Sequence, residues 1–117
     1  MKIANAYFEA MANRDVEMII SLSADDVNCI STAGELKGTT SFHGFHERFA
    51  QMLSKFTLVD AFGNDEKAVI IYKADTLPVQ DLTAVEYITV KNGKIVTTES
   101  IYDATPFAQY RAAQARH

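Results

Sequence analysis

The sequence predicts an α+β domain in which helices pack on one face of a curved, antiparallel sheet. Two observations predict it. Apolar residues recur at helical spacing in the first half of the chain, whereas the second half consists of strand-like runs separated by turn residues. Helices placed before a run of antiparallel strands favour segregated layers over a parallel sheet. The length of 117 residues fits a single domain over residues 1–117.

Two helices are expected at the start of the chain. The first covers about residues 2–13, and its apolar residues at helical spacing are Ile3, Tyr7, Ala10 and Met11. Asp15 can cap a second helix over Val16–Leu22, because a carboxylate accepts hydrogen bonds from the first free backbone amides of a helix. Asp25 and Asp26 follow directly, and we expect them to end this helix in a turn.

A third helix is expected after a turn flanked by Gly34 and Gly38. Thr39 or Thr40 can cap this helix, which should extend to about Lys55. One face of it carries large apolar residues at helical spacing: Phe42, Phe45, Phe49, Met52, Leu53 and Phe56. Such a stripe is typical of core packing.

The remaining segments are strand-like. The expected strands are Val27–Ala33, Thr57–Phe62, Lys67–Ala74, Thr83–Val90 and Lys94–Asp103. Asn92-Gly93 joins the last two strands and is the strongest short signal for a hairpin. Thr105-Pro106 then opens a short C-terminal helix.

Composition excludes several classes of function. The net charge is −4 and the 11 Lys and Arg form no basic stripe, so nucleic-acid binding is not expected. Charges interrupt every apolar stretch well before the roughly 20 residues that a membrane helix needs. No secretion signal is visible, which predicts a cytoplasmic protein. The single cysteine, Cys29, excludes an internal disulfide and a cysteine-clustered zinc site, and its apolar neighbours predict a buried side chain.

Glu86 is the most informative residue, because its strand is apolar on both faces and should be covered on both sides. A lone carboxylate there either reaches water at an edge or is buried with a raised pKa. Tyr7 lies on the apolar face of the first helix, where its hydroxyl needs a partner. That partner is either the backbone or an oxygen atom of a ligand.

The hairpin register decides which residues share a face with Glu86. A two-residue turn would place Glu86 opposite Glu99, and like charges facing each other are destabilising. A three-residue turn at Lys91-Asn92-Gly93 pairs Glu86 with Thr98 instead, and we favour it. The predicted pocket wall then consists of Glu86, Thr98, Ser100 and Tyr102.

His43 and His46 are three residues apart on the third helix. A metal site needs at least one further ligand, and no carboxylate is clearly placed to supply it, so no metal or other cofactor is expected. His46 could instead act as a base in a pocket, since the ordinary pKa of histidine is near neutrality. The alternative is a surface histidine beside Glu47.

The chain resembles the nuclear transport factor 2-like superfamily, which includes ketosteroid isomerases and SnoaL-like polyketide cyclases. The segments that carry the resemblance are YFEAMANRDVEMIISLSADDV, LKGTTSFHGFHERFAQML and AVEYITVKNGKIVTTESIYDATPF. It implies a cone-shaped fold, with three helices on the concave face of the sheet and a pocket at the wide end. It also implies a homodimer that pairs through the outer sheet face.

The resemblance assigns roles to individual residues. Tyr7 and Glu86 match the oxyanion-hole positions of the isomerases, and Phe45 matches an aromatic residue of their pocket. Ser31 falls where the isomerases hold their catalytic aspartate. A serine cannot abstract a carbon-bound proton without an activating group, so a standard steroid isomerase is not expected.

Three functions therefore remain open. The first is a cofactor-independent isomerase, cyclase or dehydratase acting on a small apolar carbonyl compound. There Tyr7 and Glu86 would polarise the carbonyl oxygen and His46 or another group would move the proton, while Ser31, Phe45, Thr98, Ser100 and Tyr102 line the pocket. The second is a non-catalytic protein that binds a small hydrophobic molecule, and the third is a dimeric interaction module.

Overall fold

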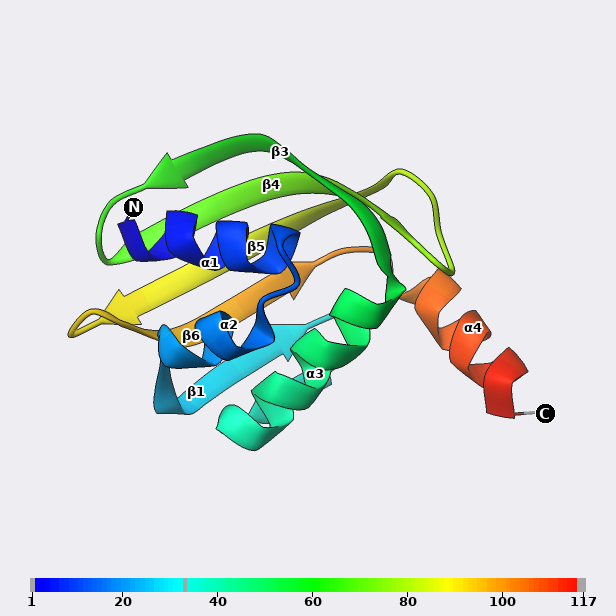
Figure 1. Cartoon of the computed structure of the whole chain (residues 1–117), viewed down its shortest axis with the longest axis horizontal. Helices are drawn as coiled ribbons and strands as arrows, with labels where there is room; N and C mark the ends of the chain where they lie inside the picture. Colours follow the sequence, from blue (N-terminus) through cyan, green and yellow to red (C-terminus); the bar gives the residue numbers. More distant parts are fainter. Residues whose placement is uncertain (1, 33, 116–117) are drawn as a thin grey trace.

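The computed structural model describes residues 2–32 and 34–115, which form one six-stranded sheet and four helices (Figure 1). The strand order is β2-β1-β6-β5-β4-β3. The strands are β1 (Ser23–Ser31), β2 (Gly34–Lys37), β3 (Leu53–Gly63), β4 (Lys67–Thr76), β5 (Leu82–Lys91) and β6 (Lys94–Ile101). The helices are α1 (Lys2–Ala12), α2 (Val16–Ser21), α3 (Thr39–Met52) and α4 (Thr105–Ala115). The α+β class is confirmed.

Helices α1, α2 and α3 cover the inner face of the curved sheet, whereas α4 extends away from its end (Figure 1). The core lies between these helices and the inner faces of β1, β4, β5 and β6. Its most deeply buried large side chains include Tyr7, Phe42, Ile70, Ile88 and Ile95. Cys29 is buried among them as expected, and burial raises the pKa of its thiol to about 11.

The sheet is mixed rather than wholly antiparallel, which corrects one expectation. β1 pairs with β6 in parallel, whereas the other neighbouring strands are antiparallel. Strands joined by a hairpin must be antiparallel, but β1 and β6 are far apart in sequence. No connecting turn therefore fixes the direction of β1, which also contacts α2 and α3.

The segment around the first strand differs from the prediction at two places. Asp25 and Asp26 belong to β1 and not to a turn, and they lie where the pairing of β1 with β6 shifts register. Both side chains are exposed, so the strand carries them without burying charge. The expected turn between Gly34 and Gly38 contains the short strand β2, which pairs with the edge of β1. Ala33, the expected end of the first strand, lies outside the described residues.

Both ends of α3 also differ from the prediction. Its N-cap is Gly38, at φ 86° and without a side-chain cap, and neither threonine caps it. Glycine adopts this backbone conformation without steric cost. The helix ends at Met52, so Leu53 and Phe56 belong to β3. A bulge between Leu53 and Lys55 places Leu53 and Phe56 on one face of the strand. Their separation of three residues is therefore the same as that of neighbours on one face of a helix.

The β5–β6 hairpin has a register that we did not expect. Asn92 and Gly93 form a two-residue turn with φ values of 53° and 73°, the left-handed values that such tight hairpins require. A bulge in β6 then shifts the pairing, so that Glu86 lies opposite Ser100. This differs from the expected pairing with Thr98 by two residues, and a shift of two keeps Thr98 and Ser100 on the same face as Glu86, as predicted.

β5 is covered on one side only. Leu82, Ala84, Glu86, Ile88 and Val90 are buried, in strict alternation with residues that are exposed or half-buried. The expectation of cover on both sides is therefore wrong for the single chain, because the helices lie on the inner face alone. None of the helices within the described residues is both long and apolar enough to cross a membrane.

Candidate active site

A cavity of about 580 Å³ opens between the inner face of the sheet, α3 and α4. A volume of this size is typical of sites for small organic molecules. Five residues expected at a pocket line it, and they are Ser31, Phe45, Glu86, Ser100 and Tyr102. His46 lines it as well. Tyr7 and Thr98 are not among the lining residues.

Glu86 lines this cavity as a deeply buried residue, with only 1% of its surface exposed. Ser100 Oγ donates a hydrogen bond of 2.6 Å to its Oε1, whereas Oε2 has no hydrogen-bond partner within the described residues. Burial raises the pKa of Glu86 to about 7, although the hydrogen bond from the Ser100 hydroxyl partly opposes this shift. Both protonation states are therefore populated near neutral pH.

His46 is buried on the inner face of α3 and is not the surface histidine that was the alternative. The rings of Phe42, Phe45 and Tyr7 pack edge-on against its imidazole. Burial, assisted by the charge of His43, lowers the pKa of His46 to about 3. The imidazole is therefore neutral at physiological pH and is a weak base.

Tyr7 lies behind this histidine and is completely buried. Its hydroxyl and His46 Nε2 form a hydrogen bond of 3.1 Å. Burial, followed by the nearby Glu86, raises the pKa of Tyr7 well above its ordinary value, so the hydroxyl keeps its proton. When Tyr7 donates to Nε2, the proton of the neutral imidazole resides on Nδ1. The partner of Tyr7 is thus neither of the two expected ones but a side chain of the site.

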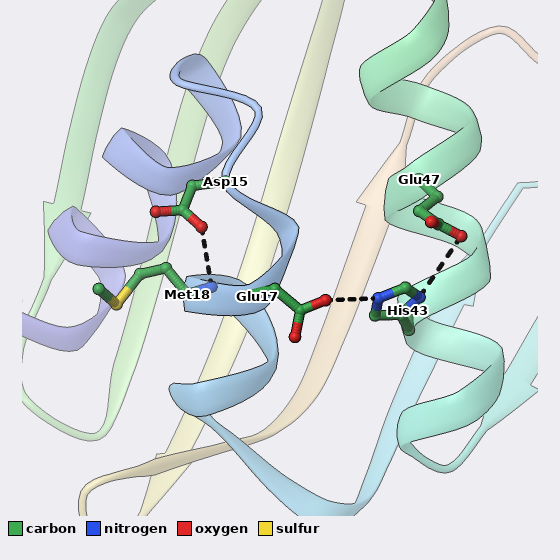
Figure 2. A network of polar contacts seen from close by, with 5 residues as sticks. All are labelled: Asp15, Glu17, Met18, His43 and Glu47. Carbon is green, nitrogen blue, oxygen red and sulfur yellow. Dashed lines mark hydrogen bonds and ion pairs between the residues drawn. The ribbon is translucent and has the colours of Figure 1, made fainter.

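His43 takes no part in the cavity and joins α2 to α3 at the surface (Figure 2). Its Nε2 lies 3.0 Å from Glu17 Oε1, and its Nδ1 lies 3.5 Å from Glu47 Oε2. The hydrogen bond with Glu17 is the main cause of the raised pKa of His43. Within the described residues no group of three or more His, Cys, Asp and Glu is arranged to hold a metal ion.

The remaining expected residues occupy different depths. Thr98 is fully buried beside Cys29, its partner in the parallel pairing, and does not reach the cavity. Ser31 is half-buried at the cavity wall, where its Oγ donates a hydrogen bond of 3.2 Å to the carbonyl oxygen of Gly34. Tyr102 packs edge-on against Phe107 of α4.

Comparison with known proteins decides the family. The SnoaL-like domain family matches residues 4–98. The chain belongs to the SnoaL-like family. Its fold is the NTF2-like cone, because an NTF2-like protein from Cytophaga hutchinsonii superposes with a TM-score of 0.77 at 13% identity, covering 91% of each chain.

Two further structures resemble this SnoaL-like domain. A protein from Kribbella flavida is 32% identical over 100% of this chain and 97% of its own, with a TM-score of 0.89. A Sinorhizobium meliloti protein, provisionally named a polyketide cyclase, has 20% identity over 86% of this chain and 94% of its own, with a TM-score of 0.76. No curated protein matches the chain.

Sequence reasoning missed Tyr72 of this SnoaL-like domain. Tyr72 lines the cavity from β4 and is only 4% exposed. Its hydroxyl makes no hydrogen bond within the described residues, and burial raises its pKa well above the ordinary value. The alternation of side chains along β4 could have identified it. The buried residues of this strand are Ala68, Ile70, Tyr72, Ala74 and Thr76, and before the terminal Thr76 only Tyr72 carries a polar group.

Proposed function

We propose that this SnoaL-like protein binds a small apolar carbonyl compound and moves a proton on it without a cofactor, as an isomerase, cyclase or dehydratase does. The observation that carries this proposal is Glu86, a buried carboxyl group with a pKa of about 7 and a free Oε2 at the end of a cavity. A general base or acid works best when its pKa lies near the working pH. Glu86 therefore fits proton transfer better than His46.

The neighbouring groups fit the carbonyl oxygen. The ionised Glu86 would take a proton from the carbon next to the carbonyl group, which leaves the negative charge on the substrate oxygen. The protonated hydroxyl of Tyr72 and the Nδ1 proton of His46 both belong to residues that line the cavity and could donate to that oxygen. Returning the proton from Glu86 to another carbon completes an isomerisation. Tyr7 then acts through His46 as a positioning residue.

Proton exchange on 2-tetralone, an apolar ketone, tests this proposal. The wild-type protein should accelerate deuterium uptake next to the carbonyl group in D₂O, followed by NMR. The rate should rise with pH through about 7, because the base must be ionised. Glu86→Gln should abolish the acceleration, and Tyr72→Phe should reduce it about 100-fold, as removal of an oxyanion donor does.

Lys55→Gln is the matched control, because Lys55 is exposed on β3 outside the cavity lining, and it should exchange at the wild-type rate. Equal exchange with wild-type protein and Glu86→Gln would contradict the catalytic proposal. Binding of 2-tetralone without exchange would favour the second candidate, a non-catalytic ligand-binding protein. Ser31 supports this second candidate. It stands where the isomerases hold their catalytic aspartate, and its hydroxyl donates a hydrogen bond to the carbonyl oxygen of Gly34.

We also propose that two copies pair through the outer sheet face. An apolar band crosses this face in two rows of paired residues: Ile71, Val85 and Ile101 in one, and Phe62, Val69 and Tyr87 in the other. Phe62 and Ile101 are more than half exposed in the single chain. Exposed apolar surface of this kind marks interaction sites.

A cytoplasmic location of the protein stays a prediction.

Sedimentation velocity tests the dimer. We expect the wild-type protein to sediment as a dimer and Ile101→Lys as a monomer, because the variant places a charge at an exposed position of the apolar band. Met18→Lys provides the control: Met18 is also an exposed apolar residue, but it lies on α2 at the opposite face. A monomeric wild-type protein at all concentrations would contradict this proposal.

A further inference from the structure

The mouth of the cavity carries two arginines that the proposed proton transfer does not use. Arg48 reaches it from α3 and Arg111 from α4. Both side chains are exposed, and neither forms an ion pair with a described residue. Arg14, by contrast, is occupied by a hydrogen bond of 2.6 Å to the carbonyl oxygen of Leu53. Two guanidinium groups without an ion pair among the described residues thus line the same cavity.

The two arginines bring positive charge to this opening, whereas the whole chain has a net charge of −4. Glu35 is the carboxylate that also lies at the mouth, but its oxygens are engaged: Oε2 accepts a hydrogen bond of 3.1 Å from Asn28, and Oε1 lies 3.7 Å from Lys37 Nζ. The arginines therefore keep their charge available. An anion would be attracted to this part of the surface.

Apolar surface continues from the arginines toward the interior. Leu77 is 66% exposed at the mouth, and Phe107 and Tyr110 of α4 line the wall beside it. The buried part of the lining is polar again, because it includes Glu86 and His46. Polar groups at both ends with an apolar wall between them match an elongated molecule that is polar at both ends.

We propose that the substrate is a carboxylic acid whose carboxylate is held by Arg48 and Arg111 at the mouth, with an apolar body and a carbonyl group directed toward Glu86. This inference rests on the proposed function for the role of the carbonyl end. Guanidinium groups match the planar carboxylate and donate two parallel hydrogen bonds.

A pair of naphthols tests this inference: 6-hydroxy-2-naphthoate carries the carboxylate, and 6-hydroxy-2-naphthamide has the same shape without the charge. Their fluorescence reports binding to the full chain. The acid should bind wild-type protein more tightly than the amide. The double variant Arg48→Gln/Arg111→Gln should weaken acid binding about tenfold and change amide binding less than about twofold, because an exposed pair gains only modest energy per contact.

Lys55→Gln controls for the loss of positive charge elsewhere and should leave both affinities unchanged. High salt should weaken binding of the acid alone. Equal affinity for acid and amide in wild-type protein, or equal losses in the double variant, would overturn the carboxylate site even if 2-tetralone exchange persists. Arginine-dependent acid binding without 2-tetralone exchange would instead support the site and contradict the proposed catalysis. Failure of both naphthols to bind wild-type protein would overturn the site.

Discussion

Replacing Glu86 by glutamine should stabilise the folded protein at pH 8 and have little effect near pH 4. In the native protein the pKa of Glu86 is about 7, against 4.5 for the exposed group, because burial disfavours the charge. As pH rises from about 4.5 to about 7, the unfolded chain releases this proton before the folded one does. Wild-type stability therefore falls over that range, by about 3 kcal/mol for a shift of this size.

Urea unfolding between pH 4 and pH 9 measures this effect. The free energy of unfolding of Glu86→Gln, relative to wild type, should grow by about 3 kcal/mol across the range, because glutamine cannot ionise. Glu99→Gln is the matched control: Glu99 is an exposed glutamate of the same hairpin, on the opposite face of β6. A difference between Glu86→Gln and wild type that stays constant with pH would contradict a raised pKa.

Removing the Phe42 ring is the second large change. Phe42 is completely buried, packs 4.6 Å from the His46 ring edge-on, and stacks at 6.5 Å against Tyr7. Phe42→Ala should lower the free energy of unfolding by about 3–5 kcal/mol, since it removes buried surface and leaves a cavity. The same cavity would let His46 leave its position. Proton exchange on 2-tetralone should therefore fall as well.

Denaturant unfolding and 2-tetralone exchange are the two measurements for Phe42. Phe42→Leu keeps most of the volume and should cost much less than Phe42→Ala in both. Met18→Ala, at a position that is 46% exposed, should change stability by less than about 0.5 kcal/mol. Equal costs for Phe42→Ala and Met18→Ala would show that the ring does not support the core.

The elements of this protein could be predicted well where local chemistry decides them. Asp15 accepts a hydrogen bond from the Met18 amide and caps α2, as a capping carboxylate should. Asn92-Gly93 forms a hairpin turn because both residues tolerate positive φ. The ends of α3 could not be read in this way, because a bulged strand placed Leu53 and Phe56 at the spacing of a helix.

The candidate site could be predicted only in part. Glu86 and His46 were recognised by residue type and position. Their protonation states depend on burial, which raises the pKa of Glu86 and lowers that of His46. A linear sequence contains no measure of desolvation. The phenol expected to face a ligand was Tyr7, yet Tyr72 lines the cavity and Tyr7 lies behind His46.

The sequence by itself determined the α+β class, the SnoaL-like resemblance and the face of the hairpin that carries Glu86, because these follow from periodicity, turn chemistry and motif order. The tertiary structure alone decided the parallel pairing of β1 with β6, the burial of His46 and the placement of Arg48 and Arg111 on one cavity. Each of these joins segments that are distant in the chain. No local preference fixes such contacts, which arise only when the helices close over the sheet.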